Sequence, residues 1–157
     1  MRKVNILLTL VLISMLCVPT FAQDKIKVGV FAGYATEIEA PAAGVKVNYS
    51  ISDQLRAAPS FAYFIKSGIT VMEVNLDANY LFGSGDNFKF YPLAGVNYYI
   101  SKVTVMGVSA SSSEIGANLG AGIDLGLSDS MGFFAEAKYT LGNANKIMAT
   151  AGITFNF

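Results

Sequence analysis

The feature that most constrains this chain is a strict alternation of apolar and polar side chains. It is clearest between residues 72 and 82, where one set of alternate positions holds Met72, Val74, Leu76, Ala78, Tyr80 and Phe82. The positions between them hold Glu73, Asn75, Asp77 and Asn79. A repeat of two residues is that of a β-strand, whose successive side chains point to opposite faces. The segment therefore predicts a strand with one apolar face and one polar face.

Eight segments alternate in this way, and no segment predicts a convincing helix. They cover residues 25–34, 44–51, 55–66, 72–82, 88–101, 114–127, 133–141 and 147–157. The expected connections are loops at 35–43 and 102–113 and shorter turns at 52–54, 67–68, 83–87, 128–130 and 142–145. The alternative to the second loop is that residues 103–108 extend the hairpin beyond the membrane. Pro59 cannot donate a ladder hydrogen bond, so a bulge or a weakened pairing is expected there.

The first 22 residues have the pattern of a cleaved signal peptide. Arg2 and Lys3 precede an apolar run over 6–18, and small residues end at Ala22, where we expect cleavage. The run is short for the alternative, a single membrane-spanning helix. Cys17, the only cysteine, lies in this leader, so no disulfide or thiolate metal site is expected in residues 23–157, which are predicted to form one domain.

The composition excludes several classes of function. Without Arg2 and Lys3, nine Lys and Arg face eleven Asp and Glu, which is not the basic balance of a nucleic-acid-binding protein. Hydrophobic residues make up 53% and charged residues 14%, yet no apolar run after the leader is long enough for a transmembrane helix. Apolar residues this abundant must be dispersed, and alternating strands disperse them.

Alternation alone does not tell which face is inside. A soluble barrel, such as a lipocalin-like ligand carrier, turns its apolar face inward, whereas a membrane barrel turns it toward lipid. The leader and the aromatic residues near the strand ends favour the membrane barrel: Tyr34, Tyr80, Phe82, Phe90, Tyr98, Tyr139, Phe155 and Phe157. Closure also leaves no unpaired backbone in hydrocarbon. The predicted fold is therefore all-β, an eight-stranded antiparallel up-and-down transmembrane β-barrel.

Three segments carry a resemblance to a known family: FYPLAGVNY at 90–98, GANLGAG at 116–122 and the terminal strand TAGITFNF. The chain resembles the small eight-stranded outer-membrane barrels of Gram-negative bacteria, the group of outer-membrane protein X and the barrel domain of outer-membrane protein A. The resemblance implies a location in the cell outer membrane. It also implies a C-terminal signal read by the barrel-assembly machinery, whose places are filled here by Thr150, Gly152, Phe155 and Phe157.

The inward face carries ten charged residues: Lys27, Lys46, Arg56, Lys66, Glu73, Asp77, Lys89, Asp124, Glu136 and Lys138. Bases and acids in one narrow lumen predict a network of ion pairs and hydrogen bonds that fills the barrel. The alternative is a narrow pore for ions or small solutes, in which these charges set selectivity.

No enzymatic activity, cofactor or metal is expected. The chain has no histidine, which most enzymes on this scaffold use by resemblance, and acid–base activation of a serine needs such a base. The expected role is structural or one of surface interaction, with both termini in the periplasm. The expected partners are outer-membrane lipid, the assembly machinery and an extracellular partner that contacts loops 35–43 and 102–113.

Overall fold

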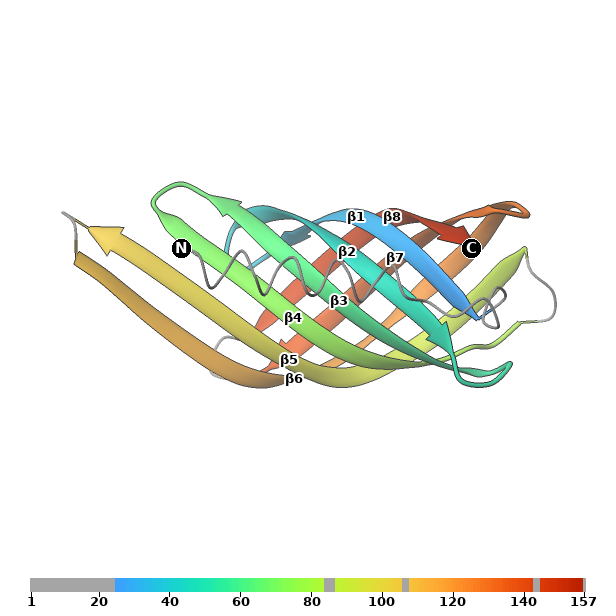
Figure 1. The fold of residues 1–157 in the computed structure, drawn as a ribbon. Helices are drawn as coiled ribbons and strands as arrows, with labels where there is room; N and C mark the ends of the chain where they lie inside the picture. Colours follow the sequence, from blue (N-terminus) through green and yellow to red (C-terminus); the bar gives the residue numbers. More distant parts are fainter. Residues whose placement is uncertain (1–24, 84–86, 106–107, 143–144, 157) are drawn as a thin grey trace.

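The computed structural model describes residues 25–83, 87–105, 108–142 and 145–156. Eight antiparallel strands pair in chain order, and the last pairs with the first, so the sheet closes into a barrel (Figure 1). The strands are β1 (Ile26–Ala35), β2 (Ala40–Ser50), β3 (Leu55–Lys66), β4 (Ile69–Tyr80), β5 (Phe88–Val105), β6 (Val108–Ser128), β7 (Met131–Leu141) and β8 (Lys146–Asn156). This confirms the predicted fold class. The expected leader, residues 1–22, lies outside the described residues.

The two faces of the barrel wall have opposite chemistry. Along β4 the inward residues Glu73, Asn75, Asp77 and Asn79 are buried. The outward Val74, Leu76 and Tyr80 are 47%, 54% and 41% exposed. The aromatic residues expected at the rims and placed by the structure are exposed as well: Tyr34, Tyr80, Phe82, Phe90, Tyr98, Tyr139 and Phe155. An apolar exterior around a polar interior is the arrangement of a transmembrane barrel.

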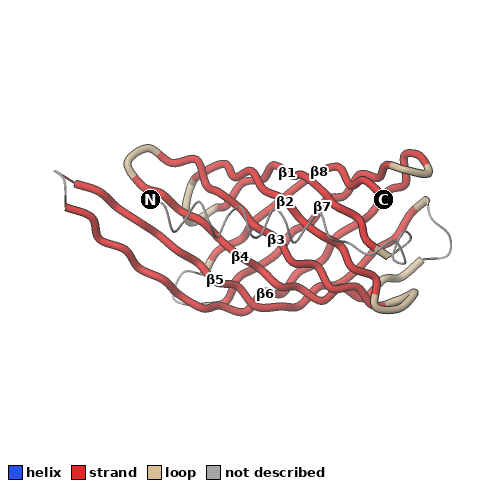
Figure 2. The backbone as a smooth tube through the Cα atoms, in the orientation of Figure 1, coloured by secondary structure: helices blue, strands red, loops and turns tan. Residues whose placement is uncertain are grey.

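The strands begin and end at two rims that differ in shape. β1 begins and β8 ends at one rim, called here the terminal rim; the opposite rim is called the distal rim (Figure 1). Almost all of the backbone between the rims is strand, with short loops at either end (Figure 2). Among the described residues, no helix is long and apolar enough to cross a membrane.

The first connection is shorter than the expected loop 35–43. β1 continues through Ala35 and β2 begins at Ala40, which leaves only residues 36–39 in the turn. Ala40 and Ala42 face the lumen and are 1% and 2% exposed, whereas Pro41 and Ala43 face outward. The run Ala-Pro-Ala-Ala alternates in space, but its residues are too alike for the alternation to be visible in the sequence.

The expected long loop 102–113 is mostly strand. β5 and β6 stay paired beyond the end of β4, through Lys102↔Ser111 and Val103↔Ala110 up to Val105↔Val108. The hairpin therefore projects past the other strands at the distal rim (Figure 1). The alternative of an extended hairpin was the correct one. Its serine tract resembles a loop because serine carries no apolar periodicity, yet regular pairing with β5 holds it in a strand.

Pro59 interrupts the pairing between β2 and β3 without shifting its register. Lys46 pairs with Ser60 and Tyr49 with Ala57, in the same register, and the pairs between them are missing. On the other side, Pro59 still pairs with Leu76 of β4. The proline therefore weakens one ladder, as expected for a residue without an N–H, and no bulge forms.

Candidate functional site

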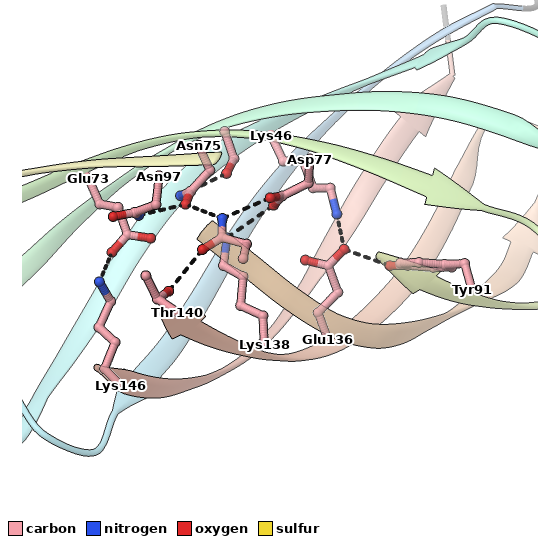
Figure 3. Close-up of polar contacts among 12 residues, drawn as sticks. Lys46, Glu73, Asn75, Asp77, Tyr91, Asn97, Glu136, Lys138, Thr140 and Lys146 are labelled. Carbon is pink, nitrogen blue, oxygen red and sulfur yellow. Dashed lines mark hydrogen bonds and ion pairs between the residues drawn. The ribbon is translucent and has the colours of Figure 1, made fainter. Parts of the chain in front are cut away.

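The lumen is the candidate site, because its polar side chains meet one another across the barrel. Four ion pairs join described residues: Lys46–Glu136, Arg56–Asp124, Lys138–Asp77 and Lys146–Glu73. Each joins strands that are not neighbours in the sheet, β2 to β7, β3 to β6, β4 to β7 and β4 to β8. Such pairs must span the lumen, so they close it with side chains from opposite walls. Figure 3 shows the pairs made by Lys46, Lys138 and Lys146.

Amide groups crowd the middle of the lumen. The Oδ1 atom of Asn75 accepts hydrogen bonds from the Nδ2 atoms of Asn97 and Asn118, each at 2.8 Å. Asn118 Nδ2 also donates to Asp77 Oδ1 at 2.8 Å, and its own Oδ1 accepts from Thr140 Oγ1 at 2.9 Å. All five side chains are buried, and their hydrogen-bonding groups satisfy one another.

Lys138 ties this amide cluster to the ion pairs. Its Nζ atom lies 3.2 Å from Asp77 Oδ2, while the other carboxylate oxygen of Asp77 accepts from Asn118. Next to it, Lys46 pairs with Glu136 Oε1, which also accepts a hydrogen bond from the Tyr91 hydroxyl at 2.8 Å. Buried charges are tolerated when they are paired and hydrogen-bonded in this way.

Aromatic rings fill the space that these polar groups leave. The Tyr91 ring is fully buried, and the Arg56 guanidinium lies 4.6 Å from its centroid. Lys46 Nζ lies 5.0 Å from the centroid of Phe134. A Cβ atom built on Gly122 would lie 2.6 Å from the Tyr91 ring and hydroxyl, so only glycine leaves room for Tyr91 here. This contact shows how closely the side chains pack in the lumen.

The lumen near the distal rim is closed by the pair of Lys146 and Glu73. Lys146 Nζ lies 2.7 Å from Glu73 Oε2, and the two side chains are 1% and 0% exposed. The angles between them are not those of a hydrogen bond, and neither oxygen of Glu73 has a hydrogen-bond partner among the described residues. Lys146 is also 4.9 Å from the Tyr99 centroid and 6.0 Å from that of Phe64. Ionic attraction and ring faces hold this pair.

The lumen near the terminal rim opens into a cavity of about 540 Å³. Its inner lining includes the pair of Arg56 and Asp124, whose Nη1 and Oδ2 atoms are 2.5 Å apart. Lys27 and Lys89 line its walls. The barrel therefore has a hollow vestibule at one end and packed side chains beyond it.

The structure places nine of the ten charged residues on the inward face, as a paired group and a cavity-lining group. Six of the nine pair among themselves, Glu73 pairs with Lys146, and Lys27 and Lys89 line the cavity. Lys66 is different. It is exposed at the distal rim, where its Nζ donates to the carbonyl of Ile38 at 2.6 Å. Because it is the last residue of β3, its side chain reaches over the turn rather than into the lumen.

The terminal strand carries the residues of the expected assembly signal. Thr150 is buried on the lumen side, and Phe155 faces outward. Gly152 lies beneath the Phe134 ring, where an added Cβ would come within 2.7 Å of it. Phe157 lies outside the described residues. Recognition of this strand by assembly machinery stays a prediction.

Sequence reasoning missed Lys146 and the amide cluster. Lys146 follows Gly142 to Asn145, and this polar stretch indicated a turn; its inward position follows only when the alternation of β8 is extended back from Met148. Alternation places these asparagines on the inward face, but the meeting of Asn75, Asn97 and Asn118 depends on how far the paired strands are staggered around the barrel. Alternation does not encode that stagger.

Comparison with known proteins agrees with this architecture. A family model described as outer membrane protein beta-barrel domain matches residues 8–157. The N-terminal β-barrel domain of Pseudomonas aeruginosa OprF aligns with a TM-score of 0.76 and 23% identity, over 86% of this chain and 98% of that one. Neisserial surface protein A aligns at 0.69 and 15%, covering 84% and 96%. The attachment invasion locus protein Ail of Yersinia pestis aligns at 0.62 and 18%, covering 85% and 97%. No curated protein matches the sequence.

Proposed function

Because this chain belongs to the family of outer membrane protein beta-barrel domains, we propose that it is a non-enzymatic barrel of the Gram-negative outer membrane, closed to ions, with a structural or surface-interaction role. The observation that carries this proposal is the set of ion pairs that cross the lumen. A barrel of eight strands has an interior just wide enough for side chains to fill. Here the side chains that fill it are bonded to one another.

The proposal includes an orientation. Both termini would lie in the periplasm, which places the distal rim at the cell surface. The proposed contact surface for an extracellular partner is that rim, namely the turn at residues 36–39 and the projecting part of the β5–β6 hairpin. In the structure, these two segments stand where loops 35–43 and 102–113 were expected.

The turn at residues 36–39 is held to β8 and keeps its charge. Glu37 Oε2 accepts from the Ile147 amide at 3.0 Å, and the Thr36 amide donates to the Ile147 carbonyl at 3.0 Å. The Thr36 hydroxyl also donates to Glu37, and this hydrogen bond holds the pKa of Glu37 below its usual value. Glu37 therefore presents a fixed negative charge, a feature that suits a rigid contact surface.

Enzymatic activity and ion conduction are the competing functions. The chain has no histidine to act as a general base, which supports a non-enzymatic role. A pore would be favoured by the cavity at the terminal rim, which already opens part of the lumen. A pore would also require the ion pairs beyond Arg56 and Asp124 to separate. Planar-bilayer recordings distinguish a pore from a closed barrel.

Single-cysteine labelling tests location and orientation together. The only cysteine lies in the expected leader, so Lys102→Cys and Ser130→Cys each place one thiol in the mature protein. Lys102 lies near the distal rim and Ser130 at the terminal rim, and both are exposed. On intact cells, a membrane-impermeant maleimide should label Lys102→Cys, and it should label Ser130→Cys only after the outer membrane is permeabilised.

Two outcomes would contradict the proposal. The reverse labelling pattern would overturn the orientation while leaving the membrane location intact. Recovery of the folded protein from the soluble periplasmic fraction, without detergent, would overturn the membrane location itself and favour the soluble ligand-carrying barrel.

A further inference from the structure

The projecting part of the β5–β6 hairpin leaves one side of β6 without a neighbouring strand. β6 pairs with β5 from Val108 to Leu125. On its other side it pairs with β7 only from Ala117 onward, because β7 ends at Leu141. Among the described residues, the stretch 108–114 therefore has a strand on one side and none on the other (Figure 1). This stretch is called here the open edge.

Every second residue of the open edge turns its backbone N–H and C=O groups away from β5. The direction follows from Gly126, whose amide donates to the carbonyl of Asn87 at 3.1 Å, in the register of the β5–β6 ladder. Backbone groups alternate in direction along a strand, so the even-numbered residues of β6 bond to β5 and the odd-numbered ones face away. Ser109, Ser111 and Ser113 therefore present their N–H and C=O groups in a row, and no described residue bonds to these groups.

The open edge lacks the features that usually protect the edge of a sheet. Such edges are commonly blunted by lysine, by proline, by a bulge or by a covering loop. The sequence of residues 108–114 is VSASSSE, which contains neither lysine nor proline, and its pairing with β5 shows no shift in register. The opposite edge of the hairpin is much shorter, because β4 pairs with β5 up to Val103. The open edge is therefore ready to pair with one more strand.

The side chains on the open edge favour an uncharged partner strand. Ser111, Ser112 and Ser113 are exposed, and they alternate between the two faces of the hairpin. Hydroxyl side chains on neighbouring strands stabilise one another by hydrogen bonds, so threonine fits beside these serines. Ile115, just below the open edge, is 76% exposed and offers an apolar contact. A segment rich in threonine and valine would match both features, and these β-branched residues favour an extended backbone.

A second copy of this chain in the same membrane is a poor partner for the open edge. Both copies of β6 would run in the same direction, so their edges could pair only as parallel strands. A two-fold axis along the barrel would place each residue opposite itself. In a parallel ladder, however, only one of two opposing residues turns its N–H and C=O toward the neighbouring strand. A symmetric pair of barrels therefore cannot satisfy these groups.

We propose that the open edge binds an extended segment of another extracellular protein, rich in threonine and valine, as a third strand of the hairpin. Main-chain hydrogen bonds would supply the affinity, and the serine face would supply the selectivity. A two-stranded hairpin in water is only marginally stable, so a third strand would also stabilise the projection. The inference rests on the proposed function in one respect, the orientation that places the distal rim outside the cell.

Amide hydrogen exchange of the folded barrel in detergent micelles, followed by NMR, tests the open edge. Without a partner, the amides of Ser109, Ser111 and Ser113 should exchange rapidly, while those of Ala110 and Ser112 are protected by β5. The probe is a capped peptide of sequence KTVTVTVK. It should slow the exchange of the three exposed amides about tenfold or more, in a saturable way. The control peptide KTVPPTVK lacks one donor on each of its edges and should have little effect.

Variants of the open edge link binding to its backbone. Ser113→Pro removes an N–H that faces away from β5, so the hairpin should stay folded, and the affinity for the peptide should fall about tenfold or more. The matched control is Ser113→Ala, which keeps the backbone groups and should bind nearly as the wild type does. Ser111→Pro is a second variant of the same kind. Protection of the Ser112 amide reports in each case that the hairpin is intact, so the test stays decisive if one variant is distorted.

Several results would overturn the proposal. Unchanged exchange of the three serine amides at high peptide concentration would show that the open edge accepts no strand. Equal binding by Ser113→Pro, or equal binding of the control peptide, would show that backbone pairing is not used. Protection that is present without peptide and rises with protein concentration would show that a second copy covers the edge.

Failure of the proposed function would be seen separately. The reverse pattern of maleimide labelling in Lys102→Cys and Ser130→Cys would place the open edge in the periplasm, without changing how the peptide binds in micelles. Normal labelling together with an edge that does not bind the peptide would leave the location and orientation standing and would remove only the third-strand proposal.

Discussion

Lys146→Met should be among the most destabilising single substitutions in this barrel. It keeps most of the length of the side chain and an apolar stem but removes the charge that faces Glu73. At the 2.7 Å separation of the two charged atoms, the Coulomb attraction is about 6 kcal/mol at an effective dielectric constant of about 20. Much of this offsets the desolvation of the pair. The loss in free energy of unfolding is therefore expected to be about 3–5 kcal/mol, the usual cost of leaving a buried charge unpaired.

The structure also predicts that replacing Lys146 and replacing Glu73 lower the free energy of unfolding by different amounts. Once Lys146 is replaced, Glu73 has neither an opposite charge nor a hydrogen bond to replace it. Once Glu73 is replaced by Gln, Lys146 still faces the rings of Tyr99 and Phe64, and such contacts contribute about 0.5–2 kcal/mol. Glu73→Gln should therefore cost less than Lys146→Met. The double variant should recover much of the loss, because it leaves no buried charge behind.

Unfolding in urea from detergent micelles or lipid vesicles measures these differences. Far-UV circular dichroism and heat-modifiable migration on gels can follow it, since the chain has no tryptophan. Lys102→Met is the matched control, an exposed lysine that should change stability by no more than about 0.5 kcal/mol. A loss below about 1 kcal/mol for Lys146→Met, or a double variant as unstable as the two losses added together, would refute the buried-pair reasoning.

Three further predictions test other parts of the barrel. Gly122→Val should lower the free energy of unfolding by about 1–3 kcal/mol in the same assay, because its side chain would enter the space of Tyr91; unchanged stability would show that the lumen is loosely packed. Pro59→Val should raise stability by about 1 kcal/mol by restoring a hydrogen bond to β2, and a destabilised variant would contradict this account of the gap in pairing. Deleting Phe157 should lower the amount of folded protein in outer-membrane fractions, whereas wild-type levels would count against the assembly signal.

The strands and their faces could be predicted from the sequence because a membrane barrel repeats one rule along every strand. Most inward positions are polar, small or aromatic, although Val71, Leu93 and Met148 are also buried inside. Most outward positions are apolar, so alternation alone places Glu73 inside and Leu76 outside. The rule fails where neighbouring residues are alike. Ala40 to Ala43 and Ser109 to Ser113 contain no contrast between faces, so both stretches resembled loops although they belong to strands.

The partners within the lumen could not be predicted, because alternation gives a direction and not a height along the barrel axis. Lys46 meets Glu136 across 90 positions of sequence, and their level is set by the stagger of the strands between them. Lys66 points inward by alternation, yet it lies at the rim and bonds to Ile38 instead.

Ion conductance tests the central claim most directly, namely that a network of paired side chains closes this outer-membrane barrel. The folded protein is inserted into planar bilayers in concentrated KCl, with insertion confirmed by heat-modifiable migration. The account predicts no conductance steps at either polarity. It would be contradicted by reproducible steps whose cation-to-anion selectivity changes when Asp77→Asn and Lys138→Met are combined, because only a path through the lumen depends on that pair.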